Sequence, residues 1–432
     1  MTQTVNPSLS NNSPVHRTVL NNGIVVLVAE NPAADIIAGR IFIRAGSCCE
    51  PREKAGLVHL LAAVITKGCD GLSSMEIAEE VESVGASLSA DTSTDYFLMS
   101  LKTVTEDFSQ ILSLAGRILR SPTFPTTQVE LERRLSINSI RSQKEQPFTL
   151  AMEQIRRVIY QDHPYAMSVM GDENSVRNIT QTDLIEYHQT YFRPDNIVIS
   201  IAGRITSNEA IALVESVFGD WQIPEQPTPT SNLPEIPVEP QSQLKPVQTQ
   251  QSIVMLGYLG AAVNSPNYAP LKLLSTYLGN GLSSRLFVEL REKRGLAYEV
   301  SAFYPTKLYP GSFLVYMGTA PENTTIALEG LHTEVELLCT TELSETSLQT
   351  AKNKILGQYA LGKQTNGQIA QIYGWYEILG LGIDYDRQFQ ELMAAVTPQD
   401  ALITARNHFQ KPYISLVGQE EAINRAISSA EL

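Results

Sequence analysis

The sequence is poor in cysteine and has no long apolar run. Four cysteines in 432 residues, none in a CxxC pair, do not make a disulfide framework. We expect them to be structural and packed like small apolar side chains, with a redox or metal role for the vicinal pair as the alternative; they are Cys48, Cys49, Cys69 and Cys339. No window approaches the ~18 uninterrupted apolar residues of a membrane helix, which predicts that the chain has no membrane span.

Positive charge is also scarce. Lysine and arginine number 32 against 46 aspartates and glutamates, which gives a net charge of −14 and a pI near 5.0. Nucleic acid is therefore excluded as a partner, because its affinity comes mainly from cations that neutralise phosphates. The overall field favours neutral or basic peptides approaching a cleft. The opening MTQTVNPSLSNNSPVHR has neither a basic-then-apolar signal nor an Arg-rich transit helix, so a cytoplasmic location is expected.

The length allows two to four domains at ~150 residues each. Seven prolines fall between Pro224 and Pro246, with few large apolar residues among them. Each proline ring fixes φ and removes a backbone donor, so this run predicts an extended linker that joins neither core. We therefore expect an N-terminal domain over 1–220, a linker over 221–250 and a C-terminal domain over 251–432.

The two halves resemble each other. Residues 179–203 and 396–418 share one order of cap, helix, Phe, Pro and short strand. Three residue pairs are each 217 positions apart: Thr180 and Thr397, Asp183 and Asp400, Phe192 and Phe409. A constant offset indicates a tandem duplication, and hence two homologous domains.

Strand-like runs alternate with long helical stretches in each half. In the N-terminal half these runs are Ile24–Ala29, Ile36–Ile43, Phe97–Leu101 and Ile197–Ala202. Some are separated by a short turn and others by a helix, which favours a mixed sheet backed by helices over a doubly wound parallel sheet. The fold class is therefore α+β or α/β.

The segment 56–68, GLVHLLAAVITKG, predicts a buried helix that a glycine closes. His59 is the polar residue in its middle. Such a histidine is usually a packed structural residue, and a metal-ligand role needs a second ligand nearby.

The segment 277–302, YLGNGLSSRLFVELREKRGLAYEVSA, carries a second polar cluster. Its Gly279-Asn280-Gly281 lacks the further glycine and the preceding strand of a dinucleotide fingerprint. Taken alone, Arg291 belongs to a solvated charge run and Tyr298 to the start of an amphipathic strand.

Together, an RAGS turn at 44–47, the AGLVHLL helix followed by KG, and the SSRLF…LREKRGLAY phrase closely resemble the pitrilysin and mitochondrial-processing-peptidase family of zinc peptidases. In these inverzincins the helix carries H-x-x-E-H, with the general-base Glu before the second His ligand. In register, His59 is the first ligand, but Ala62 holds the position of the base and Ala63 that of the second ligand.

The third zinc ligand of the family is a Glu about 75 residues later, seven residues after another acidic residue. A capping-box pattern at 127–130, just after Pro125, predicts a helix there. Glu132 occupies the acidic position and Ser139 the ligand position, on nearly the same helix face. The site is thus degenerate, because one neutral imidazole cannot hold zinc.

The resemblance implies an α/β sandwich of two homologous domains, each a largely antiparallel sheet backed by helices, which forms half of a clamshell around extended peptides. It also implies a homologous catalytic partner with intact H-x-x-E-H. Zinc is then expected on that partner and no cofactor on this chain. Arg291 and Tyr298 match the residues that bind substrate and stabilise the oxyanion in trans. The isolated chain could also form a homodimer.

We expect a non-catalytic, substrate-binding subunit of a heterodimeric zinc endopeptidase. One alternative is a scaffolding subunit like the core subunits of respiratory complexes, against which the intact Arg/Tyr pair argues. Another is an enzyme with a different metal site, but its candidate ligands are scattered along the chain. These are His163, His188, His332 and His408.

Overall fold

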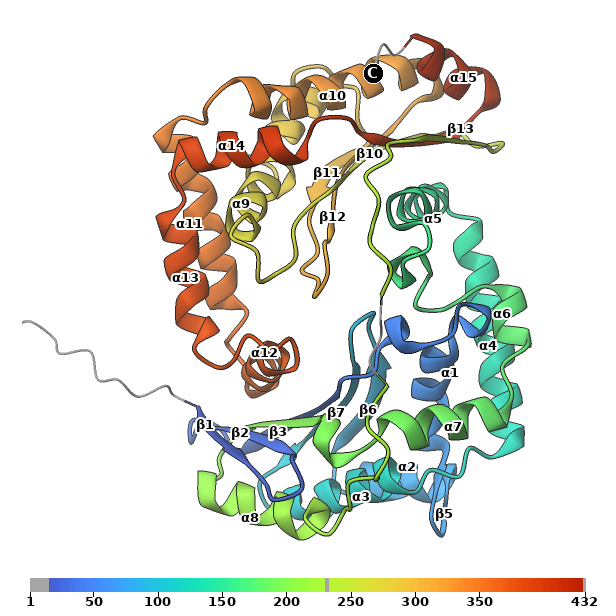
Figure 1. The fold of residues 1–432 in the computed structure, drawn as a ribbon, viewed down its shortest axis with the longest axis vertical. Coiled ribbons are helices and arrows are strands. Elements are labelled where there is room, and N and C mark those ends of the chain that lie inside the picture. The colour runs from blue at the N-terminus through green and yellow to red at the C-terminus, as the bar shows by residue number, and fades with distance from the viewer. Residues whose placement is uncertain (1–14, 230–232, 430–432) are drawn as a thin grey trace, which may run out of the picture.

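The computed structural model describes residues 15–229 and 233–429, which form two domains of one sheet plus helices each (Figure 1). The N-terminal domain occupies the lower half of the view and the C-terminal domain the upper half. Residues 1–14, which carry most of the segment examined for targeting signals, lie outside the described residues.

The N-terminal sheet has six strands, of which β2 and β8 are parallel and all other neighbours antiparallel. In spatial order they are β1 (His16–Val19), β2 (Val25–Glu30), β8 (Ile197–Gly203), β3 (Ile36–Ile43), β7 (Phe97–Val104) and β6 (Ser87–Thr92). A small hairpin lies apart from it, made of β4 (Gly68–Cys69) and β5 (Leu72–Ser73).

The C-terminal sheet has five strands with the same pattern, in which β9 and β13 are parallel and the rest antiparallel. In spatial order they are β9 (Ser242–Pro246), β13 (Tyr413–Gly418), β10 (Ser252–Leu259), β12 (Ser312–Thr319) and β11 (Glu299–Phe303). The expected mixed, largely antiparallel sheets backed by helices are confirmed.

The helices follow the same order in both halves, except that a π-helical segment, Phe287–Glu292, takes the place of α2 in the C-terminal half. Those of the N-terminal half are α1 (Leu57–Val64), α2 (Ser74–Glu82), α3 (Phe108–Arg120), α4 (Thr126–Lys144), α5 (Pro147–Tyr160), α6 (Glu173–Arg177), α7 (Gln181–Tyr191) and α8 (Ser207–Phe218). Those of the C-terminal half are α9 (Tyr268–Gly279), α10 (Thr324–Thr340), α11 (Glu345–Leu361), α12 (Asn366–Ile378), α13 (Tyr385–Ala395), α14 (Pro398–His408) and α15 (Glu420–Ser429).

The repeat found in the sequence reappears at two helix starts. The Thr180 hydroxyl accepts a hydrogen bond from the backbone N–H of Asp183 at the start of α7. Thr397 accepts the same bond from Asp400 at the start of α14. Both are complete capping boxes, which satisfy backbone donors that a helix start leaves unpaired.

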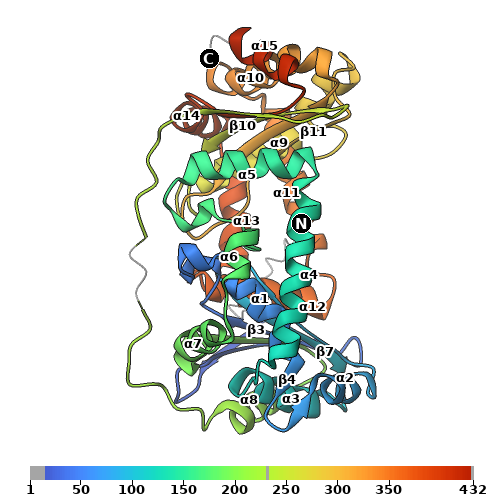
Figure 2. The same cartoon turned by 90° about the vertical axis from the view of Figure 1, so that its right-hand side faces the viewer.

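Two helices are exchanged between the halves. Helix α5 of the N-terminal half packs on strands of the C-terminal sheet, and α12 of the C-terminal half packs on the N-terminal sheet (Figures 1 and 2). Both contacts are close because a glycine lies at each: a Cβ on Gly374 of α12 would come within 2.3 Å of the Phe42 ring, and one on Gly257 of β10 within 2.8 Å of Ile159 on α5.

The proline-rich segment runs up one side of the molecule between the domains (Figure 2). Its last residues, Ser242–Pro246, form β9 and pair with β13, so this part joins the C-terminal sheet instead of remaining outside both cores. Strand β9 lies at the sheet edge, where a proline is tolerated because its missing N–H faces no partner strand.

Two local details differ from the sequence analysis. Helix α1 ends at Val64 and a 3-10 turn, Ile65–Lys67, follows it, while Gly68 is extended and begins β4. Helix α4 starts at Thr126 with Pro125 as its N-cap, so the expected capping box at 127–130 does not form. Glu130 instead pairs with Arg133, 3.1 Å away.

No helix within the described ranges is long and apolar enough to cross a membrane. Cys69 is buried in the core of the N-terminal domain, as expected for a structural cysteine.

Candidate functional site

Helix α1 carries His59 and lies between α4 and the edge strand β6. Its start is fixed by Glu50, whose carboxyl oxygens accept hydrogen bonds from the backbone N–H groups of Gly56 at 2.8 Å and Val58 at 3.0 Å. An acceptor at this point satisfies donors that the first helical turn cannot pair internally. The helix that holds the degenerate motif is therefore well anchored.

The His59 side chain is half-buried and faces two acidic residues. Burial lowers the pKa of His59, while the charges of Asp91 on β6 and Glu132 on α4 oppose this shift. Asp91 was not singled out from the sequence, because only sheet pairing brings β6 beside α1. The N-terminal half thus gathers one imidazole and two carboxylates in one region.

These groups do not form a zinc site. Ala62 is buried and Ala63 half-buried on α1, and neither can donate an electron pair to a metal. Glu132 is paired with Lys67, 3.3 Å away, and Ser139 is exposed on α4. Within the part of the chain that the structure describes, no three His, Cys, Asp or Glu side chains are grouped so that they could hold a metal ion. The donor set does not fit zinc, which takes three protein ligands in catalytic sites.

Arg291 lies on the C-terminal half, in a short π-helical segment, Phe287–Glu292. Its guanidinium sits over the Phe287 ring, 4.9 Å from the ring centroid, and the residue is exposed. The neighbouring Glu289 is occupied by Arg285 at 3.3 Å and Lys293 at 2.8 Å. Among the described residues Arg291 has no carboxylate partner, so its donors are available to a ligand.

Tyr298 directly precedes the edge strand β11. Its backbone N–H donates to the carbonyl of Gly318 at 2.9 Å, which fixes the main chain. Its side chain is 62% exposed, and its hydroxyl makes no hydrogen bond within residues 15–229 and 233–429. A phenol held in this way by its backbone alone is free to donate to an incoming group.

The structure thus forms two separate clusters from the expected site residues. His59, Ala62, Ala63, Glu132 and Ser139 lie on the packed pair α1 and α4. Arg291 and Tyr298 lie in the C-terminal half, and no hydrogen bond, ion pair or ring contact between described residues joins them to the first cluster.

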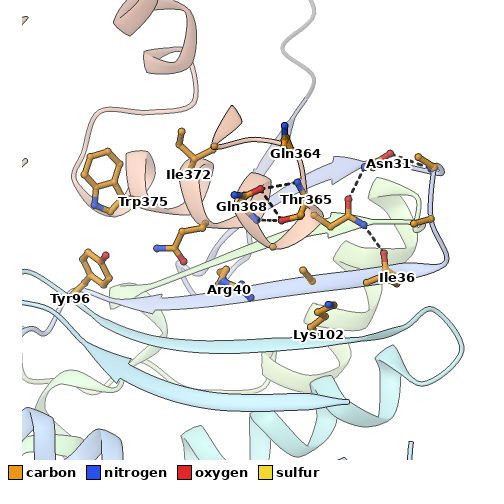
Figure 3. A pocket seen from close by; sticks show the side chains of 17 residues that line it. Asn31, Ile36, Arg40, Tyr96, Lys102, Gln364, Thr365, Gln368, Ile372 and Trp375 are labelled. Carbon is orange, nitrogen blue, oxygen red and sulfur yellow. Dashed lines mark hydrogen bonds between the residues drawn. The ribbon is translucent and has the colours of Figure 1, made fainter. Parts of the chain in front are cut away.

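A cavity of about 940 Å³ lies between α12 and the strands β3 and β7; we call it the inter-domain cavity (Figure 3). Arg40 and Lys102 line it without any acidic residue, and Tyr96 and Trp375 lie at one end. Burial lowers the pKa of Arg40. Sequence reasoning missed Arg40, although it is the one charged residue in the otherwise apolar run of β3.

Asn31 and Ile36 lie at the opposite end of this cavity (Figure 3). Both residues are bonded to Asn366 of α12: the Asn31 side-chain amide donates to the Asn366 side-chain oxygen at 2.7 Å, and the Asn366 amide donates to the Ile36 carbonyl at 2.8 Å. These bonds fix the start of α12 to the N-terminal domain.

Three of the scattered histidines bond to nearby backbone or amide groups. His163 accepts from the Tyr165 N–H at 3.1 Å, and His188 lies 2.8 Å from the Leu119 carbonyl. His408 lies 3.0 Å from the Leu259 carbonyl. Each contact is typical of a structural histidine.

Two family models match the chain. The model "Insulinase (Peptidase family M16)" matches residues 25–173 and the model "Peptidase M16 inactive domain" matches residues 178–355. The chain is similar to the uncharacterized zinc protease YmxG of Bacillus subtilis, 26% identical over 358 residues that cover 83% of this chain and 87% of that protein. It is also similar to an uncharacterized zinc protease of Rickettsia felis, 24% identical over 90% of this chain and 94% of that protein.

Solved structures share the fold. A peptidase M16 inactive domain from Pseudomonas fluorescens matches with a TM-score of 0.86 and 24% identity, covering 94% of this chain and 98% of that chain. A protease from Helicobacter pylori matches with a TM-score of 0.87 and 21% identity, covering 94% and 99%.

Proposed function

Because the chain belongs to peptidase family M16 but has a single histidine where zinc needs three ligands, we propose that it is the non-catalytic, substrate-binding subunit of a heterodimeric zinc endopeptidase. Its partner is a homologous chain with an intact H-x-x-E-H helix, and the pair acts in the cytosol on peptides or unfolded polypeptides. The partner supplies the zinc chemistry, and this chain supplies groups that grip the substrate.

One observation carries the proposal: Arg291 and Tyr298 are both exposed and lack side-chain hydrogen bonds or ion pairs in the described structure, although a charge network surrounds Arg291. Arg285, Glu289 and Lys293 are four residues apart and pair along one helix face, whereas Arg291 is two residues from Glu289 and projects from a different face. Its donors therefore remain open to a ligand outside the chain. The contact with Phe287 limits the motion of the guanidinium and keeps it presented to solvent.

Each group has a definite task. The Tyr298 hydroxyl donates a hydrogen bond to the oxyanion that forms on the scissile carbonyl, and this bond strengthens as negative charge develops. The Arg291 guanidinium offers directional donors to a substrate carbonyl or carboxylate and so positions the peptide.

The sheet edges offer a way to hold the peptide backbone. Strands β6 and β11 are edge strands, so each has a row of backbone groups without a partner strand in the described chain. An extended peptide can add to such an edge through main-chain hydrogen bonds. On β6 it would pass α1 and Asp91, and on β11 it would pass Tyr298.

Complementation tests this function. The full chain is mixed with a homologous chain that carries H-x-x-E-H, and the degradation of an unfolded, fluorogenic peptide is followed for each chain alone and for the mixture. We expect the mixture to be active and each chain alone to be nearly inactive. A complex that forms without any gain in peptidase activity would leave the scaffolding alternative in its place.

A further inference from the structure

A second cavity, of about 660 Å³, lies on the C-terminal half; we call it the α9 cavity. Residues of α9, β11 and α11 line it, and α12 and α13 complete it. In the order of elements, α9, β11 and α11 are the repeats of α1, β6 and α4. The α9 cavity is therefore the internal counterpart of the region around His59. It also shares Ile372 and Trp375 with the inter-domain cavity, so the two are adjacent.

Lys272 is the charged residue of this cavity. Its ammonium donates to the Tyr304 carbonyl at 2.7 Å and lies 5.7 and 5.5 Å from the ring centroids of Tyr268 and Tyr304. An ammonium has three N–H donors, and no other hydrogen bond or acidic partner of Lys272 is present in the described residues. Burial lowers the pKa of Lys272 to about 8, which reflects a cation without a counter-ion.

Tyr385 is a second, independent unpaired donor. The residue is 5% exposed, and its hydroxyl has no hydrogen-bond partner among the described residues, although it lines the same cavity. Buried hydroxyls are normally paired, so an unpaired one in the wall of a cavity indicates a missing hydrogen-bond partner, either an acceptor or a donor. Lys272 and Tyr385 together offer donors and no acidic acceptor.

We propose that the α9 cavity binds a carboxylate of the peptide, with Lys272 as its counter-ion, Tyr385 as a neutral donor and the surrounding tyrosine rings against the apolar part of that residue. This inference rests on the proposed peptide-binding function and adds a subsite to it. A single ammonium suits a group with one negative charge, whereas phosphate sites usually combine arginines or several backbone N–H groups. The volume falls in the range of small-ligand sites, about 300–1,000 Å³.

The carboxylate can come from a peptide's C-terminus or from an Asp or Glu side chain. Three N-terminally labelled, unstructured peptides of one sequence distinguish these sources: a neutral peptide with a free C-terminus, the same peptide amidated, and the amidated peptide with one Glu. Fluorescence anisotropy with the full chain gives each affinity. In a Trp221→Phe background, Trp375 is the remaining tryptophan and its emission reports occupancy of the cavity that it lines.

We expect at least one carboxylate peptide to bind roughly tenfold more tightly than the neutral amide, the size typical of a charged hydrogen bond. Lys272→Met should remove this preference and Tyr385→Phe should reduce it, while Lys411→Met, at an exposed lysine, should not change it. Equal affinities for all three peptides on the unmodified chain would overturn the carboxylate subsite and leave peptide binding intact. Binding of none of them, by the chain or by its complex with the partner, would overturn the proposed function as well.

Discussion

Arg17 on β1 and Glu377 on α12 form a two-point salt bridge between residues 360 positions apart. The distances are 3.1 Å from Nε to Oε2 and 2.8 Å from Nη2 to Oε1. Glu377 is 7% exposed, so its carboxylate depends on this partner. The bridge joins the first strand of one half to the exchanged helix of the other.

Replacing Glu377 with Ala should lower the free energy of unfolding by about 2 kcal/mol, because Arg17 loses a partly buried, bidentate partner. Chemical denaturation monitored by circular dichroism measures this. Glu391→Ala is the control, since its pair with Arg387 is exposed on one helix face and should contribute under about 0.5 kcal/mol. Equal losses for the two variants would contradict this assignment.

In the reconstituted complex, Tyr298→Phe should lower turnover by ~10²-fold, since one oxyanion donor is lost and the ring is retained. Arg291→Ala should also raise KM, because the peptide is positioned less firmly. Arg387→Ala, at an exposed arginine of α13, is the control. Steady-state kinetics on a short peptide would measure both parameters. Activity that ignores both substitutions, in a complex that still assembles, would exclude a substrate role for the pair.

The purified chain should contain well under one zinc per chain and should not cleave unstructured peptides, because Ala62, Ala63 and Ser139 stand where base and ligands are needed. Elemental analysis after purification without chelator measures the metal. About one zinc per chain, lost together with peptidase activity in His59→Ala, would disprove the degenerate-site interpretation.

Restoring the ligands should restore zinc affinity. The triple change Ala62→Glu, Ala63→His and Ser139→Glu places the family's motif on α1 and α4, which already pack together, and should raise affinity by orders of magnitude. Competition with a chelating dye measures it, and the same triple change with His59→Ala is the control. A folded triple variant without zinc uptake would show that the register chosen for Ala63 or Ser139 is wrong.

Stability should fall as pH is lowered from about 6.5 towards 4, in part because of His188. Burial lowers the pKa of His188 from 6.5 to about 4, so between these values the unfolded chain binds a proton that the folded chain does not. The neutral form therefore stabilises the fold above pH 6.5, and this contribution is lost as pH falls. Denaturation at several pH values should show a smaller slope for His188→Gln than for the unmodified chain, with His332→Gln as the control. Identical slopes would contradict the assignment.

Local chemistry explains what could be predicted from the sequence. The caps at Thr180 and Thr397 involve residues three apart, so the repeat could be recognised without knowledge of packing. The start of α4 differs from the expected one by two residues, because Pro125, and not Thr127, serves as the N-cap and places Thr126 in the first turn. The strand β3 matches its sequence range, since its run of apolar residues is bounded by polar ones.

Long-range packing explains what could not be predicted. Asp91 approaches His59 only because β6 pairs at the sheet edge beside α1. Lys272 and Tyr385 are 113 positions apart and share a cavity that five elements build. The one available signal was Lys272 itself, the single charged residue in the apolar segment YAPLKLLSTYLG.

Because α5 and α12 each pack on the sheet of the other half, packing contacts hold the two halves together as well as the covalent linker does. Each sheet depends on a helix encoded in the other half, so neither half retains its inner layer when made alone. If a peptide bond in the proline-rich segment were cleaved, α5 and α12 would still pack on the sheet of the other fragment and hold the two fragments together. Such a chain could be divided between two genes at this segment, whereas a single-copy version of the repeat would have to exchange its helix with a second molecule.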